Sequence, residues 1–258
     1  MTAGTPATVA AETEPAATVA NFRRLAAEDL LALALLHHAE PSGELLESLR
    51  QDGGSLGLGL ESQSAAGQAA LQAMVAAFAG LPETLDQGII DQFAADYADI
   101  YLTNGYGASP HESVWLDEDH LMRQEPMFQV RACYARHGLT AGNWRTRPED
   151  HLALELQFLA YLLAPERGDT LTEAAQFLDE HVLRWLPAFA QRVAERCRTR
   201  FFAALAQLTT AYCEELRDLL ALVLVQPRPT AAEIEQRMKP KTAPAVSVTF
   251  MPGQGPTW

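Results

Sequence analysis

The sequence predicts an all-α protein, and three observations support this fold class. Alanine and leucine dominate the 258 residues, whereas the β-branched residues that favour strands are sparse. Apolar side chains recur at intervals of three and four residues in one segment after another, which is the spacing of helices that bury one face. No pair of segments has the alternating pattern of paired strands, and residues 246–250 are the only short strand candidate. We therefore expect a bundle of helices.

The N-terminal half of the chain contains four segments with helical spacing. Residues 1–18 carry alanine, threonine, proline and glutamate without periodicity, so we expect them to be a disordered tail. Residues 52–59 form a glycine-rich connector that lacks the ending of a phosphate-binding loop. Helices are expected at about 19–38, 44–50, 65–79 and 83–101.

The C-terminal half has clearer signals for the starts and ends of helices. Pro126 and Gly138 are well placed to begin and to end one helix. Thr146 and Glu149 have the spacing of a capping box before the next one. Helices are expected at 126–137, 148–164, 171–185, from Pro187 onward, and at 199–225. An irregular tail is expected over 227–258.

Charge and composition narrow the classes of function. The chain has 33 acidic and 19 basic residues, a formal charge of −14, so nucleic acid should be repelled and a cationic partner attracted. Solubility alone is the simpler explanation of the same acidity. The N-terminus lacks the pattern of a secretory signal, and no apolar run approaches the roughly 18 residues of a membrane span. We expect a cytoplasmic protein without stable membrane insertion.

The cysteines and histidines do not form a recognisable metal or catalytic pattern. Cys133, Cys197 and Cys213 lie in helical segments without CxxC spacing, so we expect buried, reduced thiols. The adjacent His37 and His38 diverge by about 100° on a helix and cannot easily share one ion. No zinc-binding spacing, nucleophile elbow or kinase motif occurs. No metal, cofactor or catalytic residue is therefore predicted from spacing.

Four stretches of the chain occur in an order that is specific in combination. Pro110–Leu116 matches the pattern P-x-E-S-[VI]-[YW]-L, and Pro148–His151 matches E-P-x-D-H except that Arg147 replaces an acid. Residues 177–187 and 201–212 resemble FLxxHLxxWxP and FYxxLAxLTxxF. Over most of residues 20–220 the chain thereby resembles the TorD/DmsD family of redox-enzyme maturation chaperones.

This resemblance implies a fold and a function. The fold would be a helix bundle with an N-terminal helical subdomain at 19–140, a hinge at 141–147 and a smaller C-terminal helical subdomain at 148–226. The protein would bind the twin-arginine signal peptide and the apo-form of a molybdenum-containing oxidoreductase, assist cofactor insertion and delay export, without being an enzyme. Family members occur as monomers and as domain-swapped dimers, and weak guanine-nucleotide binding has been proposed for some. The sequence does not identify the client enzyme.

The two matched loops are the expected peptide site. We expect them to face each other across a groove, with these residues contacting the peptide: Glu112, Ser113, Trp115, Pro148, Glu149, Asp150 and His151. Asp150 would supply charge to the arginine pair, His151 would orient Asp150 or bind a peptide carbonyl, and Trp115 would offer an aromatic face. On spacing alone a structural role is favoured, in which Asp150 caps its own helix and His151 packs into the core.

Two other functions remain open at this point. One is a NarJ-type chaperone that assembles a nitrate reductase, although the FLxxHLxxWxP stretch favours the TorD/DmsD side. The other is a nucleotide-binding hydrolase that uses Asp150 and His151. Such an enzyme needs a phosphate cradle or a nucleophile beside a base, and the sequence contains neither.

Overall fold

The computed structural model describes residues 7–143 and 145–239, and these residues fold into helices. The first six are α1 (Ala7–His38), α2 (Gly43–Gln51), α3 (Ala65–Ala79), α4 (Gln87–Tyr97), α5 (Glu112–Leu116) and α6 (Glu125–Arg136). The next five are α7 (Leu152–Leu163), α8 (Leu171–Phe177), α9 (Leu183–Arg196), α10 (Arg200–Leu224) and α11 (Ala231–Met238). Two π-helical segments, η1 (Ala98–Leu102) and η3 (Leu178–Val182), and the 3₁₀ segment η2 (Pro165–Arg167) complete them. Among the described residues β-pairing is limited to one isolated bridge, so the all-α prediction is confirmed.

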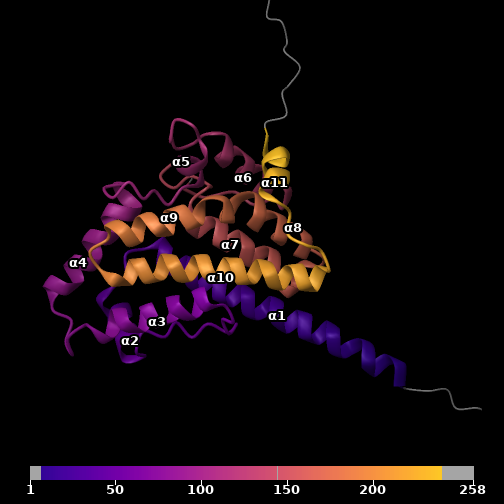
Figure 1. The fold of residues 1–258 in the computed structure, drawn as a ribbon, viewed down its shortest axis with the longest axis horizontal. Coiled ribbons are helices and arrows are strands. Elements are labelled where there is room, and N and C mark those ends of the chain that lie inside the picture. Colours follow the sequence, from indigo (N-terminus) through magenta and orange to yellow (C-terminus); the bar gives the residue numbers. More distant parts are fainter. Residues whose placement is uncertain (1–6, 144, 240–258) are drawn as a thin grey trace, which may run out of the picture. The chain divides into compact units, whose positions relative to one another are not determined.

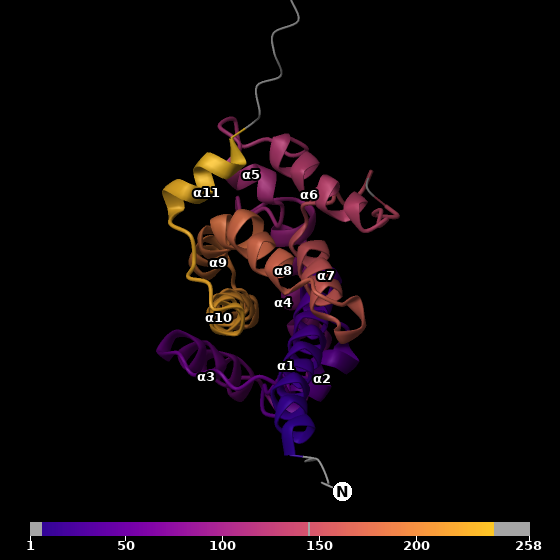
Figure 2. The same cartoon turned by 90° about the vertical axis from the view of Figure 1, so that its right-hand side faces the viewer.

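The described residues up to Arg228 form one compact unit, in which α10 is the central helix. Helix α10 lies between α9 on one side and α3 on the other (Figure 1 and Figure 2). Its apolar residues explain this position, because Phe201 packs edge-on against Phe78 of α3 and Phe202 contacts Phe93 of α4. The described residues from Pro229 onward, which include α11, belong to a second unit.

Helix α1 packs along α7, which follows the expected hinge in sequence. Arg23 of α1 is buried and donates hydrogen bonds to the carbonyls of Leu163 and Ala164 at the end of α7, at 3.0 and 2.8 Å. Carbonyls in the last turn of a helix have no partner within the helix, so the guanidinium of Arg23 satisfies them. The α1–α7 and α3–α10 contacts both join residues that precede segment 141–147 to residues that follow it. The division into two subdomains stays a prediction.

Both ends of the described chain are more helical than expected. Helix α1 begins at Ala7, so the expectation of a disordered tail is wrong for residues 7–18. Alanine and glutamate favour helix even where no apolar stripe is present. The expected irregular tail is likewise helical over Ala231–Met238, where Thr230 and Glu233 form a complete capping box. Residues 1–6 and the strand candidate 246–250 lie outside the described residues.

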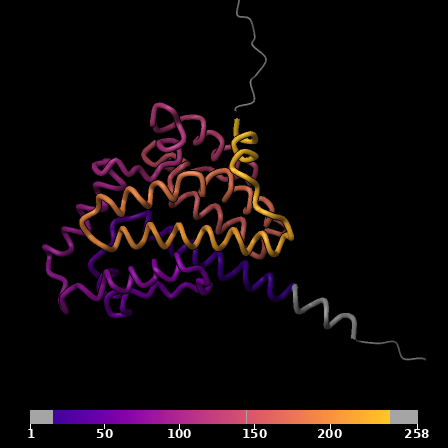
Figure 3. The backbone as a smooth tube through the Cα atoms, viewed as in Figure 1, coloured from indigo at the N-terminus to yellow at the C-terminus, as the bar shows by residue number. Residues whose placement is uncertain are grey.

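Helices α8 and α9 join through η3 into one continuous run, which Figure 3 traces without a break. We expected Pro187 to open a helix, but it lies inside α9. Pro187 has no N–H to donate to the carbonyl of Leu183, four residues earlier, yet the helix continues past it to Arg196. By contrast, α10 has almost the predicted bounds, and Gly138 follows α6 at a positive φ of 69°.

Candidate functional site

The two loops that carry the matched motifs pair with each other through their backbones. The N–H of Glu112 donates to the carbonyl of Asp150 at 3.0 Å, and the N–H of Leu152 donates to the carbonyl of Pro110 at 2.8 Å. This antiparallel bridge ties the start of α5 to the start of α7. Segments that are almost 40 residues apart in sequence therefore form one structural element.

Asp150 holds the partner loop and not its own helix. The backbone N–H and the hydroxyl of Ser113 both donate to Oδ2 of Asp150, at 2.9 and 2.5 Å. Ser113 lies in the first turn of α5, so the Asp150 carboxylate caps α5 from outside. The side chain is fully buried, and Oδ1 has no hydrogen-bond partner among the described residues.

His151 caps α7, whereas the sequence suggested Thr146 or Asp150 for that role. Its Nδ1 accepts a hydrogen bond from the backbone N–H of Ala153 at 3.1 Å, so His151 is the N-cap of α7. The predicted capping box of Thr146 and Glu149 is therefore wrong, and α7 begins four residues later than expected because residues before it pair with the other loop. Burial, together with nearby positive groups, holds the pKa of His151 well below its usual range.

Pro148 and Glu149 also face inward. Both are buried, and the Glu149 carboxylate accepts two hydrogen bonds from Arg131 of α6, at 2.8 and 3.1 Å. The carbonyl of Glu149 accepts a third from the hydroxyl of Tyr134, at 3.0 Å. This loop is thereby fixed to α6 as well as to α5.

Glu112 forms a buried ion pair that the sequence did not indicate. Its carboxylate lies 3.0 Å from Nδ1 of His181 in η3, and both side chains are almost fully buried. The Nε2 atom of His181 lies 3.7 Å from Sγ of Cys133. Burial alone would lower the pKa of His181, but the Glu112 carboxylate and the Cys133 contact raise it to about 10. The imidazolium therefore balances the Glu112 carboxylate at neutral pH.

Glu155 adds a third buried carboxyl group beneath the paired loops. Burial raises its pKa well above the usual range, and the negative charges of Glu112 and Asp150 add to the effect. The protonated form of Glu155 is therefore favoured, and its Oε2 accepts a hydrogen bond from the indole N–H of Trp185 at 3.2 Å. Sequence reasoning missed Glu155 because it lies within the apolar run of α7, where nothing marks a single acid as buried.

Trp115 is the most accessible of the seven expected site residues, being half-buried while the other six are buried. Its indole N–H donates to the carbonyl of Ser109 at 2.8 Å. The ring packs edge-on against Phe189, and the guanidinium of Arg192 lies 5.9 Å from its centroid. The structure thus brings all seven residues together, but their contacts are mainly with one another and with the core.

The three cysteines differ in burial. Cys133 and Cys213 are buried free thiols, whereas Cys197 is only half-buried and the expectation of full burial was wrong there. Among the described residues no three His, Cys, Asp or Glu side chains are grouped to hold a metal ion. Within the same ranges, none of the helices has both the length and the apolar character that crossing a membrane requires.

Comparison with known proteins places the chain in a family. The sequence model of the family described as nitrate reductase delta subunit matches residues 62–191, half of the chain, including both paired loops. The chain belongs to this family. The nitrate reductase delta subunit family includes the TorD-type proteins that the sequence motifs resembled, so that prediction is confirmed.

Several curated relatives of this family member are named chaperone protein TorD. The protein from Vibrio vulnificus strain YJ016 is 33% identical over 131 residues, which are 47% of this chain and 61% of the relative. The protein from Vibrio cholerae serotype O1 is 34% identical over 138 residues, 50% of this chain and 62% of the relative. The one from Photobacterium profundum is 30% identical over 132 residues, 48% and 61% of the two chains. The chain therefore spans about three fifths of the length of the curated relatives it matches.

Proposed function

We propose that this protein is a cytoplasmic chaperone that binds the twin-arginine signal peptide and the apo catalytic subunit of a molybdenum-containing oxidoreductase. By holding the apo-enzyme it would assist cofactor insertion and delay export. The observation that carries the proposal is the family match over both paired loops, together with relatives that are named as TorD chaperones. We propose no enzymatic activity and no resident cofactor, and a monomer or a domain-swapped dimer as the working form.

The charge of the chain supports a cationic ligand. A formal charge of −14 attracts the paired arginines of such a signal and speeds their encounter, and added salt weakens the attraction. The apolar segment that follows the arginines suits docking of a helix into an apolar groove. Both parts of the signal thus have a physical reason to bind this protein.

The paired loops are the proposed recognition site for the arginines. Oδ1 of Asp150 is a buried carboxylate oxygen without a hydrogen-bond partner among the described residues, which is costly unless a donor reaches it. A guanidinium would supply that donor if the 109–115 loop moved aside, and a charge-assisted hydrogen bond of this kind contributes about 1.5–3 kcal/mol. Trp115, which is half-buried at the edge, would then contact the peptide first.

Calorimetry with a synthetic signal peptide tests the proposal. The peptide should come from the molybdoenzyme encoded beside this protein and should bind with an affinity that falls as salt is raised. A peptide with both arginines replaced by glutamine is the control and should bind at least about tenfold more weakly. No binding of the unaltered peptide would refute the proposed function.

A NarJ-type chaperone for a nitrate reductase is the second candidate, and the description of the matching family favours it. The two candidates differ in the client, which can be tested with the same titration. Tighter binding of a nitrate reductase N-terminal peptide than of any twin-arginine signal would select the NarJ-type function. A hydrolase that uses Asp150 and His151 is not supported, because both side chains are engaged in capping helices.

A further inference from the structure

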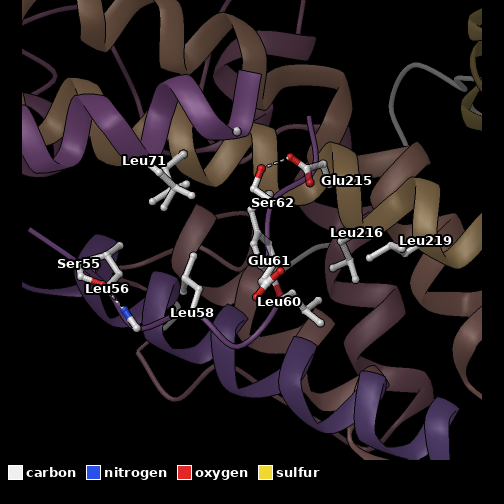
Figure 4. Close-up of a pocket in the computed structure, with 14 residues that line it drawn as sticks. Ser55, Leu56, Leu58, Leu60, Glu61, Ser62, Leu71, Glu215, Leu216 and Leu219 are labelled. Carbon is white, nitrogen blue, oxygen red and sulfur yellow. Dashed lines mark hydrogen bonds between the residues drawn. The ribbon is translucent and has the colours of Figure 1, made fainter. Parts of the chain in front are cut away.

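One apolar surface of the protein is open in this structure, and we call it the α10 groove. It is a pocket between the loop 55–62, α3 and α10, whose lining residues are drawn in Figure 4. Its volume is about 400 Å³. Its walls are mainly leucine side chains, among them Leu56, Leu58, Leu60, Leu71, Leu216 and Leu219. Pockets of a few hundred Å³ with such a lining are typical of ligand sites.

The first wall of the groove is fixed in place by Asp29 of α1. Its buried carboxylate accepts hydrogen bonds from the backbone N–H groups of Gly59 and Leu60, at 2.6 and 2.9 Å. The hydroxyl of Tyr212 in α10 donates to the same carboxylate at 3.0 Å. One side chain therefore ties the loop to α1 and to α10, and the loop does not have to be ordered when a ligand binds.

Glu215 of α10 fixes the other end of the loop. It accepts hydrogen bonds from the Ser62 hydroxyl at 2.5 Å and the Gln63 N–H at 2.8 Å, and also from the Ser64 hydroxyl. Burial tends to raise the pKa of Glu215, but these hydrogen bonds outweigh it and lower the pKa. A carboxylate charge therefore lies at the edge of the apolar groove.

The chemistry of the groove defines its occupant. Leu219 is 38% exposed, and Val223, one turn further along α10, is 37% exposed, so the apolar surface continues along the helix. Glu61 lines the groove, is exposed and has no ion-pair partner among the described residues, and the lining contains no lysine or arginine. Aliphatic side chains flanked by positive charge fit this surface by shape and by charge.

We propose that the α10 groove binds the apolar segment of the signal peptide, and that the negative charges of Glu61 and Glu215 beside the groove steer the cationic peptide toward it. The proposal rests on the proposed function for the identity of the peptide. It differs in location, because most of the groove lies outside the matched residues 62–191 and none of its lining residues belongs to the paired loops. In this structure the groove is open, whereas the side chains of the paired loops, apart from the half-buried Trp115, are mostly buried.

A matched pair of leucine variants tests the groove. Leu219→Gln places a polar group in it and should weaken binding of the signal peptide about tenfold. Leu222→Gln is the control, because Leu222 lies on the same helix, is 74% exposed and does not line the pocket. Its affinity should stay within about twofold of the unaltered protein. Equal affinities of the two variants would overturn the groove proposal.

A photo-crosslinking peptide separates this proposal from the proposed function. The peptide carries photo-leucine in its apolar segment, and the crosslinked residues are located by mass spectrometry. Crosslinks within 55–71 or 208–223 are expected. Crosslinks confined to 109–115 or 148–151 would overturn the groove while keeping the proposed function. A peptide that binds nowhere on the folded protein would overturn both.

Discussion

Asp150 and Ser113 are 37 residues apart in sequence, yet the Asp150 carboxylate accepts hydrogen bonds from both the N–H and the hydroxyl of Ser113. The contact is buried and joins the two loops that carry the family motifs. Asp150 therefore has a structural role that is neither capping of its own helix nor direct exposure to a ligand. The effect of the Asp150 charge and the effect of its hydrogen bonds to Ser113 can be separated by experiment.

The first prediction compares Asp150→Asn with Ser113→Ala. Asparagine keeps an acceptor for Ser113 but removes the charge. Alanine at 113 keeps the charge and removes two hydrogen bonds, the one that the Ser113 hydroxyl donates to Asp150 and the one that it accepts from the Arg123 N–H at 3.2 Å. Each should destabilise the fold by about 1–2 kcal/mol. Only Asp150→Asn should also weaken binding of the signal peptide about tenfold, as measured by calorimetry below the melting temperatures of both variants. If Ser113→Ala weakens peptide binding equally, the affinity depends on the structure of the paired loops and not on the Asp150 charge.

The second prediction concerns the buried pair of Glu112 and His181. His181→Gln leaves the Glu112 carboxylate buried without its cation, so the free energy of unfolding at pH 7 should fall by about 3–5 kcal/mol. The exposed His120 provides the control, and His120→Gln should change it by less than about 0.5 kcal/mol. Urea denaturation of both variants measures the difference.

The same pair predicts how stability depends on pH. The pKa of His181 is about 10 in the folded protein and near 6.5 when unfolded, so its contribution is complete below pH 6.5. That contribution is lost as the pH rises from 6.5 through 10. Stability should therefore decline over this range, and the decline should be smaller in His181→Gln. Parallel curves for the two proteins would contradict the assignment.

The third prediction is that Glu155→Gln stabilises the protein above neutral pH. The folded pKa of Glu155 is raised by burial and by its acidic neighbours, so its stabilising contribution lies at low pH and is lost as the pH rises. Glutamine has nearly the same shape and can still accept the Trp185 hydrogen bond without having to stay protonated. At pH 8 Glu155→Gln should therefore unfold at a higher urea concentration than the unaltered protein. The gain should vanish near pH 4.

The fourth prediction tests the glycine loop beside the α10 groove. Gly54 has a φ of 79°, and a Cβ there would lie 2.8 Å from the carbonyl oxygen of Met74. Gly57 has a φ of 61° and open space around it. Gly57→Ala should cost about 1 kcal/mol through backbone strain alone, and Gly54→Ala at least about 1 kcal/mol more. Thermal unfolding of the two variants would contradict this if their melting temperatures coincided.

The fold was largely predictable because most helices are specified by local patterns. The apolar stripes of α3 and α10 occur at the expected positions within one or two residues. The start of α7 was not predictable, since Pro148–Asp150 pair with another loop instead of beginning the helix. Competition between a local cap and a distant partner leaves no signal in the local sequence.

The sequence predicted which loops form the candidate site, but not the burial or the electrostatics of its side chains. The motifs identify the loops that pair, yet they do not indicate that Asp150 and Glu112 are buried. Glu155 lies in an apolar helix where nothing marks it as a buried acid. His181 is the histidine of the FLxxHLxxWxP stretch, but that motif does not indicate its buried partner Glu112. The α10 groove was missed because its glycine-rich loop reads as a flexible connector, although Asp29 holds it from 30 residues away.

Helix α1 packs on α7 and α3 packs on α10, so both interfaces join residues before segment 141–147 to residues after it. This arrangement affects how fast a monomer and a chain-exchanged dimer could interconvert. A dimer that exchanged its chains at this segment would rebuild the same two interfaces between copies. Neither form could convert into the other without exposing most of the core, so interconversion should be as slow as unfolding of the whole domain. Monomer and dimer fractions separated on a sizing column should therefore keep their elution positions when they are run again hours later.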